Sequence, residues 1–134
     1  MGFLIDASVL IAFERDALDV DAFVGSRREV GALLSVITAS ELLHGVHRAA
    51  AAARRARREA WVEGVIARLP LLEIDLPAAR AHARLWAELA ARGKMIGAHD
   101  LWLAAQAVAG GHVLITANER EFDRVPGLDV EVWA

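Results

Sequence analysis

Short, mostly apolar segments alternate along this chain with longer segments that have helical character. The apolar segments are Gly2–Ile5, Gly31–Ile37, Leu69–Ile74, His112–Ile115 and Asp129–Trp133. A strand that is apolar on both faces is typical of a parallel sheet, because helices cover both sides of such a sheet. Pro70 favours an edge position for the third segment, since proline cannot donate a hydrogen bond to a neighbouring strand. The alternation predicts a single α/β domain over residues 1–134 with a mostly parallel sheet.

The segments between these strands carry the start and stop signals of helices. Thr38-Ala39-Ser40-Glu41 has the pattern of a capping box, in which the threonine and the glutamate each bond a backbone amide at the helix start. We therefore expect a helix from Thr38 to about Gly45. Further helices are expected to begin at Asp6 and to cover residues 16–23, 49–68, 75–92 and 97–109. The helix over 75–92 is expected to present one stripe of apolar residues, Ala79, Ala83, Trp86 and Ala90. It is expected to end at Gly93.

Charge and composition exclude several classes of function. The chain has no cysteine, which excludes a disulfide framework, a thiolate metal site and a cysteine nucleophile. The formal net charge is -3, so binding of nucleic acid would need a local basic patch or metal ions. No stretch approaches the roughly 18 uninterrupted apolar residues of a membrane-spanning helix. We expect a cytoplasmic protein without membrane association.

Three acids and one amide stand directly after predicted strands or at predicted helix starts. They are Asp6, Glu41, Asp100 and Asn118. Because the carboxyl ends of parallel strands meet at one edge of the sheet, these side chains are expected to converge. Each acid alone has an ordinary explanation as a helix-start residue. Together they predict a cation site, since clustered carboxylates repel one another and raise one another's pKa values.

The available ligands favour a hard divalent ion at this site. Mg²⁺ and Mn²⁺ take carboxylate and carbonyl oxygens and keep several bound waters. The histidines carry no zinc-binding helix motif with an acid between them. We therefore expect the acidic cluster to hold Mg²⁺ or Mn²⁺.

Four segments stand in an order and at a spacing that a known family shares. They are Phe3–Ile11, Ser40–Gly45, Ile96–Ala105 and Thr116–Leu128. In these segments the chain resembles the PIN-domain ribonucleases, and specifically the VapC-type toxins of bacterial toxin–antitoxin modules. The resemblance covers nearly the whole chain. It implies a PIN-like three-layer α/β/α domain with four to five strands, an endoribonuclease dependent on Mg²⁺ or Mn²⁺, a homodimer, and a cognate VapB-type antitoxin.

The resemblance also implies roles for particular residues. Asp6, Glu41 and Asp100 match the family's acids, which are expected to be catalytic and to hold the metal. Asn118 stands at a fourth catalytic position that is often aspartate, so the cluster has one negative charge less. Glu121, in preference to Glu119, is expected to compensate. The implied reaction is hydrolysis of RNA phosphodiesters by a metal-activated water, without a covalent nucleophile.

Three further sets of residues are expected around this site. The hydroxyls of Ser8 and Thr116 either support the metal ligands and phosphate oxygens or are ordinary turn residues. The arginines form either a solvated helix face or an arm that contacts RNA phosphates: Arg48, Arg54, Arg55 and Arg58. The early apolar residues form either ordinary core or the groove that receives the antitoxin: Val9, Leu10, Phe13 and Phe23.

Two other functions stay open at the level of sequence. The first is a PIN-like scaffold that binds RNA or a protein partner without cleavage, which the amide of Asn118 motivates. The second is a carboxylate–metal phosphatase that acts on small phosphate esters. Ser8 disfavours the phosphatase, because such an enzyme is expected to carry a second acid two residues after Asp6.

Overall fold

One parallel sheet organises the computed structural model, which describes residues 2–15 and 31–133. Its strand order is β3-β2-β1-β4-β5, and every neighbouring pair is parallel. The strands are β1 (Gly2–Ile5), β2 (Gly31–Ser35), β3 (Leu71–Leu72), β4 (Val113–Thr116) and β5 (Asp129–Val132). The predicted parallel sheet is confirmed, with the proline-bearing segment at its edge. The helix expected over 16–23 lies outside the described residues.

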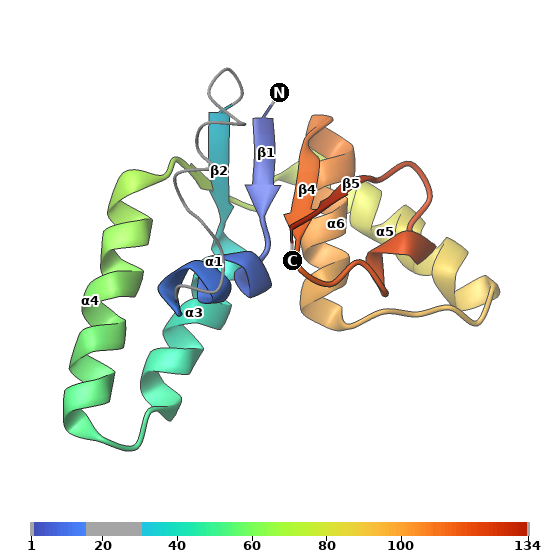
Figure 1. Ribbon diagram of the computed structural model, residues 1–134. Helices are drawn as coiled ribbons and strands as arrows, with labels where there is room; N and C mark the ends of the chain where they lie inside the picture. The colour runs from blue at the N-terminus through green and yellow to red at the C-terminus, as the bar shows by residue number, and fades with distance from the viewer. Residues whose placement is uncertain (1, 16–30, 134) are drawn as a thin grey trace.

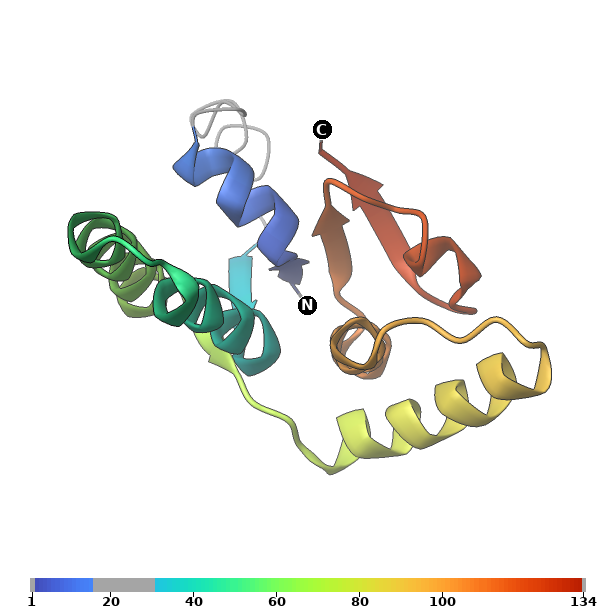
Figure 2. The same ribbon diagram turned by 90° about the horizontal axis from the view of Figure 1, so that it is seen from below.

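Helices cover both faces of this sheet (Figures 1 and 2). They are α1 (Ala7–Glu14), α3 (Val36–Arg48), α4 (Ala52–Arg68), α5 (Leu76–Ala91) and α6 (Ala98–Gly110), with a short 3₁₀ helix, η1 (Phe122–Arg124). Buried residues of α1, α3 and α4 form a core cluster on one face, and those of α5 and α6 form a cluster on the other. The three-layer α/β/α arrangement is thereby confirmed.

The central strands divide their side chains between these two clusters. In β1, Phe3 and Ile5 belong to the cluster with α1, α3 and α4, whereas Leu4 belongs to the cluster with α5 and α6. In β4, Leu114 and Ile115 divide in the same way. Successive side chains of a strand point to opposite faces, so a strand between two helical layers must be apolar at every position. This requirement explains the continuous apolar pattern of the sequence.

The order of the strands reverses between β1 and β4. From β1 the chain builds outward through β2 to β3, and then crosses by α5 and α6 to place β4 on the other side of β1. The Asp6 amide donates to the Ile115 carbonyl at 2.8 Å, which joins the carboxyl ends of the two strands. Ligands of open parallel sheets bind outside the carboxyl ends at such a reversal. The fold therefore places its candidate site after β1 and β4.

The start of α3 differs from the sequence prediction. Ser35 is the N-cap, and its hydroxyl accepts a hydrogen bond from the Ile37 amide at 3.0 Å. Thr38 and Glu41 lie inside the helix, so the predicted capping box is wrong. The apolar segment 31–37 is a strand up to Ser35 and the first turn of a helix from Val36. Composition alone does not separate these two parts, because both are apolar.

The buried stripe of α5 also differs from the prediction. The buried residues are Ala78, Ala81, Leu85 and Leu89, and Trp86 is 55% exposed. The predicted positions lie one or two residues after the buried ones, and the structure buries two leucines in place of one tryptophan and one alanine. The expected end of this helix is confirmed, because Gly93 adopts a φ of 64°.

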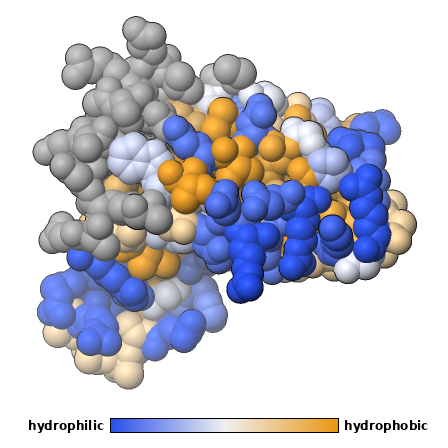
Figure 3. All heavy atoms as spheres, turned by 45° about the vertical axis from the view of Figure 1, so that its right-hand side comes forward, coloured by the Kyte–Doolittle hydropathy of each residue, from blue (hydrophilic) through white to orange (hydrophobic). Residues whose placement is uncertain are grey.

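The surface over β5 shows apolar side chains gathered near the middle of the face drawn in Figure 3. β5 is an edge strand, and its Val132 is 42% exposed. None of the described helices is long and apolar enough to span a membrane.

The new helix start predicts opposite effects for two neighbouring substitutions. Ser35 accepts from the helix and donates to the Gln106 side chain. We expect Ser35→Ala to lower the free energy of unfolding by about 1–3 kcal/mol, because it removes the cap and leaves a buried amide oxygen unpaired. Thr38→Val should be neutral or stabilising, since the Thr38 hydroxyl is buried without a partner among the described residues. Urea unfolding measures both, and a destabilised Thr38→Val would restore a capping role for Thr38.

Candidate active site

Asp6 follows β1 directly and is held by two hydroxyl groups. Its Oδ2 accepts hydrogen bonds from Ser8 Oγ at 2.7 Å and from Thr116 Oγ1 at 2.9 Å. The two hydroxyls in turn accept backbone amides, Ser8 from Ala117 at 3.1 Å and Thr116 from Asn118 at 3.0 Å. The Ser8 proton is thereby left to bond the carboxylate, and the Thr116 proton has two acceptors, the carboxylate and the Asn118 carbonyl at 3.1 Å. Asp6 is 8% exposed, and one oxygen is held while Oδ1 carries no protein hydrogen bond among the described residues.

Glu41 reaches the same region from the second turn of α3. Its Oε1 is buried and has no hydrogen-bond partner among the described residues. Burial raises the pKa of Glu41, the negative charge of Asp6 raises it further, and His99 opposes the shift. A buried carboxylate oxygen without a donor is costly, because it has lost water and gained nothing in return.

Asp100 lies in the first turn of α6, after the N-cap Gly97. Burial, a hydrogen bond with Glu121, and the charges of Asp6, Glu121 and Glu41 raise the pKa of Asp100 to about 8. The same hydrogen bond lowers the pKa of Glu121. The hydrogen bond between the two carboxyl groups therefore favours the protonated form of Asp100 and the ionised form of Glu121.

Glu121 is the fourth acid of this cluster. It stands just before η1, and the Gly97 amide lies 3.5 Å from its Oε2. Glu119 is exposed, and the structure records only its backbone carbonyl as an acceptor, from the Asp123 amide. The position preferred from sequence is therefore the one that contacts Asp100.

Asn118 lies close to the cluster but uses its side chain locally. Its Oδ1 accepts a hydrogen bond from the Arg120 amide at 3.3 Å, and the residue is exposed. Its backbone amide orients the Thr116 hydroxyl that binds Asp6. The geometry gives position 118 a place in the turn that supports Asp6, while the charge comes from Glu121.

The donor set fits a hard divalent ion that keeps much of its water. Among residues 2–15 and 31–133, no three histidine, aspartate or glutamate side chains stand together closely enough to hold one ion by themselves. Mg²⁺ commonly binds through one or two carboxylates and several waters, which needs no such cage. The unpartnered Glu41 oxygen and the proton retained by Asp100 are the signs of a cluster that lacks positive charge.

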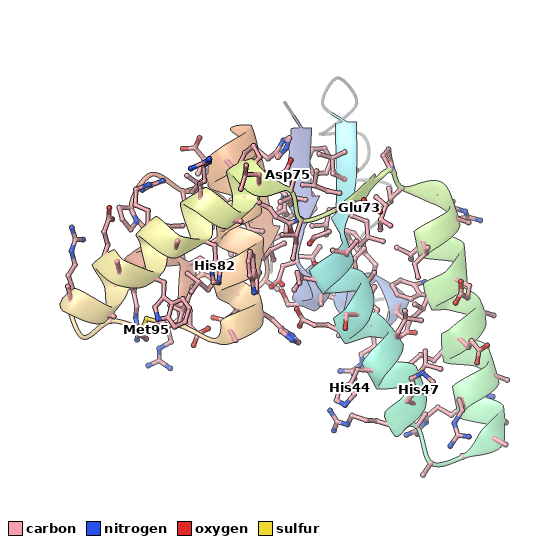
Figure 4. All side chains as sticks on the ribbon, turned by 180° about the vertical axis from the view of Figure 1, so that it is seen from behind. His44, His47, Glu73, Asp75, His82 and Met95 are labelled. Atoms are coloured by element: carbon pink, nitrogen blue, oxygen red, sulfur yellow. The ribbon has the colours of Figure 1, made fainter. Side chains whose placement is uncertain are left out.

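A cleft of about 890 Å³ adjoins the acids. Glu41 and His44 line it from α3, and His99 lines it from α6. Figure 4 shows His44 projecting from α3. His99 was missed at the level of sequence, although it stands next to Asp100 and its charge acts on Glu41. The only signal for it was that position, since a single exposed histidine has no motif.

The four arginines named from sequence have different surroundings. Arg48, Arg54 and Arg58 line the cleft. Arg55 does not line it, because its guanidinium donates twice to the Ala49 carbonyl, at 3.1 and 2.7 Å. The sequence shows a run of like residues, and the structure separates it into individual environments.

The apolar residues named for an antitoxin groove are not all on the surface. Val9 is 0% and Leu10 is 4% exposed, and both belong to the core cluster of α1, α3 and α4. The expectation of a groove is therefore wrong for these two side chains, because they pack against the sheet. Phe13 is half-buried at the edge of that cluster, and Phe23 lies outside the described residues.

Known proteins share this fold and this sequence pattern. The PIN domain family matches residues 3–128. The tRNA(fMet)-specific endonuclease VapC of Salmonella typhimurium is 40% identical over 100 residues, which are 75% of this chain and 74% of that protein. Ribonuclease VapC1 of Rickettsia felis is 32% identical over 130 residues, 97% of this chain and 95% of the relative.

A solved structure agrees with these relatives. In the DNA-bound VapBC complex of Salmonella typhimurium, one chain matches this one with a TM-score of 0.89 and 32% identity, over 100% of this chain and 99% of that one. The strand order, the acids after β1 and in α6, and the extent of these matches lead to one conclusion. The chain belongs to the VapC ribonucleases of the PIN-domain family.

Proposed function

We propose that this protein is a single-domain endoribonuclease toxin whose catalytic centre is formed by Asp6, Glu41, Asp100 and Glu121. The observation that carries the proposal is the convergence of these acids at the strand reversal, with the pKa of Asp100 raised to about 8. PIN-domain nucleases generally depend on a divalent metal ion, and the family matches nearly the whole chain. We infer that Mg²⁺ or Mn²⁺ is the ion, because all of the donors are carboxylate oxygens.

The protein's own residues prepare the site in distinct ways. Ser8 and Thr116 hold one oxygen of Asp6, which leaves its other oxygen for an ion. Asp100 has to release its proton to become a ligand, and Glu121 is the hydrogen-bonded neighbour that accepts or passes on that proton. A bound divalent ion would lower the pKa of a water and neutralise charge on the phosphate. Asn118 orients Thr116 and contributes through that hydroxyl.

Glu121 supports cleavage over the alternative of a binding module without cleavage. A binding module without cleavage was motivated by the missing fourth charge, and Glu121 supplies a charge in contact with Asp100. Ser8 is engaged with Asp6 and Ala117, so it occupies the place where the alternative phosphatase would need an acid.

The RNA substrate that we propose is the initiator tRNA. The support is the Salmonella typhimurium relative at 40% identity, which is named for its action on tRNA(fMet). An RNA substrate and the absence of a membrane-spanning helix among the described residues fit the proposed cytoplasmic location.

We further propose two protein partners. A VapB-type antitoxin is supported by the VapBC complex that matches this chain at 32% identity. A second copy of the chain, which would form a homodimer, is supported by exposed apolar residues on β3, on α5 and in the loops beside them. These residues are Leu71, Ile74, Leu76, Trp86 and Met95. Met95, in the loop after α5, is labelled in Figure 4.

Removing either aspartate should separate activity from stability. We expect Asp6→Asn and Asp100→Asn each to abolish RNA cleavage with Mg²⁺ or Mn²⁺, because each removes an ionisable oxygen ligand. The melting temperature without metal should stay unchanged or rise, because Asp6→Asn removes a charge from a repelling cluster and Asp100→Asn replaces a carboxyl group that already favours its protonated form. Asp129→Asn is the matched control, an exposed aspartate at the amino end of β5 that should keep full activity. Full activity in either site variant would refute the assignment.

The raised pKa of Asp100 predicts how metal-free stability depends on pH. In the unfolded chain this carboxyl ionises near 3.8, and in the folded protein near 8. Between these values the folded state binds more protons, so the free energy of unfolding should fall as pH rises through that window and level off above it. Glu41, whose pKa is also raised, acts in the same direction, and Glu121 acts in the opposite one at low pH.

Thermal melts with a chelator measure this dependence. Asp100→Asn should flatten it, and Mg²⁺ or Mn²⁺ should raise the melting temperature most at the alkaline end, where Asp100 is ionised and the cluster is most negative. An unchanged slope in Asp100→Asn would show that the proton resides elsewhere.

The substrate proposal is tested by direct comparison of purified RNAs. We expect initiator tRNA to be cleaved faster than elongator methionine tRNA and than an unstructured messenger fragment, with gel mapping of a single principal cut. Equal rates on all three RNAs would reject tRNA specificity and leave the nuclease assignment intact.

A further inference from the structure

Four arginines from three helices line the cleft beside the catalytic acids. They are Arg15 at the end of α1, Arg48 in α3, and Arg54 and Arg58 in α4. The lining residues of this cleft include one acid, Glu41. A concentration of positive charge around an open volume, in a chain whose net charge is -3, requires an explanation.

Arg58 is already bound within the protein. Its Nη2 lies 3.3 Å from Glu14 Oε1, and the side chains of this pair are only 27% and 17% exposed. Its Nη1 also packs beside Gly45 of α3, so closely that a Cβ there would lie 3.4 Å away. One guanidinium therefore contacts α1 and α3 from α4.

Arg55 is bound as well, by the turn that joins α3 to α4. It donates two hydrogen bonds to the carbonyl of Ala49, which is the C-cap of α3. Both bonds satisfy an acceptor that the end of a helix leaves open. Arg55 is thus a part of the helical hairpin, and two of its N–H groups are occupied by this carbonyl.

Arg15, Arg48 and Arg54 have no such partner. All three are exposed and line the cleft, and among the described residues none takes part in an ion pair or a side-chain hydrogen bond. Their donors have no partner among residues 2–15 and 31–133, and guanidinium groups match phosphate oxygens in geometry as well as in charge. The same cleft is also lined by Glu41, one of the proposed catalytic acids, and by His99.

We propose that Arg15, Arg48 and Arg54 form a subsite for backbone phosphates of the RNA next to the scissile phosphate, while the Glu14–Arg58 pair is a positioning clasp. The inference rests on the proposed nuclease function. It divides the arginines by their partners: free guanidinium groups bind the substrate, and bound ones hold α1, α3 and α4 in place. RNA is favoured over an acidic peptide because the subsite continues into the catalytic acids, where a phosphodiester has to pass.

The first experiment measures RNA binding in the presence of a chelator, which prevents metal-dependent cleavage. The probe is a fluorescent single-stranded oligoribonucleotide, and affinity is followed against salt concentration. Arg48→Gln and Arg54→Gln should each reduce the slope of log affinity against log salt by about 0.7, the value for one phosphate contact on a single strand. Arg68→Gln is the control, because Arg68 is exposed at the end of the same helix and does not line the cleft.

The second experiment separates the clasp from the subsite. Glu14→Gln and Arg58→Gln should each lower the melting temperature by several degrees and leave the salt slope unchanged, and the double variant should melt no lower than the less stable single one. If Arg58 instead binds phosphate, Glu14→Gln will release it and steepen the slope. That result would overturn the clasp.

Steady-state cleavage with Mg²⁺ completes the test. Arg48→Gln and Arg54→Gln should raise KM several-fold with little change in kcat, because a neighbouring phosphate is bound equally in the ground and transition states. If the wild type cleaves RNA but both variants keep the wild-type slope and KM, the subsite is refuted and the nuclease function stands. If wild type cleaves no RNA with either metal, the function fails while the binding slopes still decide the subsite.

An acidic segment of a partner protein is the competing occupant. If Arg48→Gln and Arg54→Gln weaken capture of an acidic peptide while leaving RNA binding unchanged, the phosphate subsite is overturned. If they weaken RNA binding and leave the peptide unaffected, it is supported.

Discussion

Electrostatic repulsion among carboxyl groups dominates the end of the sheet where β1 and β4 meet, because the charges of Asp6, Glu41 and Glu121 all act on Asp100. The end of β1, the second turn of α3, the first turn of α6 and the turn before η1 each bring one acid to the strand reversal. Two protein devices reduce the repulsion. Hydroxyl groups donate to Asp6, and the hydrogen bond with Glu121 favours the protonated form of Asp100. In the function proposed above, a divalent ion would neutralise the remaining charge and activate a water for hydrolysis.

The two helical layers serve this centre differently. The layer with α5 and α6 has a continuous apolar core that fixes the helix carrying Asp100. In the layer with α1, α3 and α4, some side chains pack against the sheet, and others line the cleft beside Glu41. Because α3 contributes both to the core and to the cleft wall, its position sets the distance between Glu41 and Asp6. The contacts of Arg58 with Glu14 and Gly45 act on that same helix.

Asn118 has an amide at a position where the family often has a carboxylate. An amide at this position loses a negative charge, yet its backbone and side chain build the turn that orients Thr116. The charge is supplied three positions later by Glu121, whose hydrogen bond determines where the shared proton resides. In this turn the support of Asp6 and the contact with Asp100 therefore come from different residues.

The alternation of strands and helices, the parallel sheet and the candidate acids Asp6, Glu41 and Asp100 could be predicted from the sequence, because each depends on local pattern or on position after a strand. Features whose partners are distant in the chain could not be predicted. Ser35 caps α3 and bonds Gln106, which is 71 positions away, and this contact ended the strand earlier than composition indicated. Burial of Val9 and Leu10, and the division of the arginines into bound and free groups, likewise followed from packing between elements. Periodicity identifies which side chains are apolar or charged, but the partner that each one meets is set by the three-dimensional path of the whole chain.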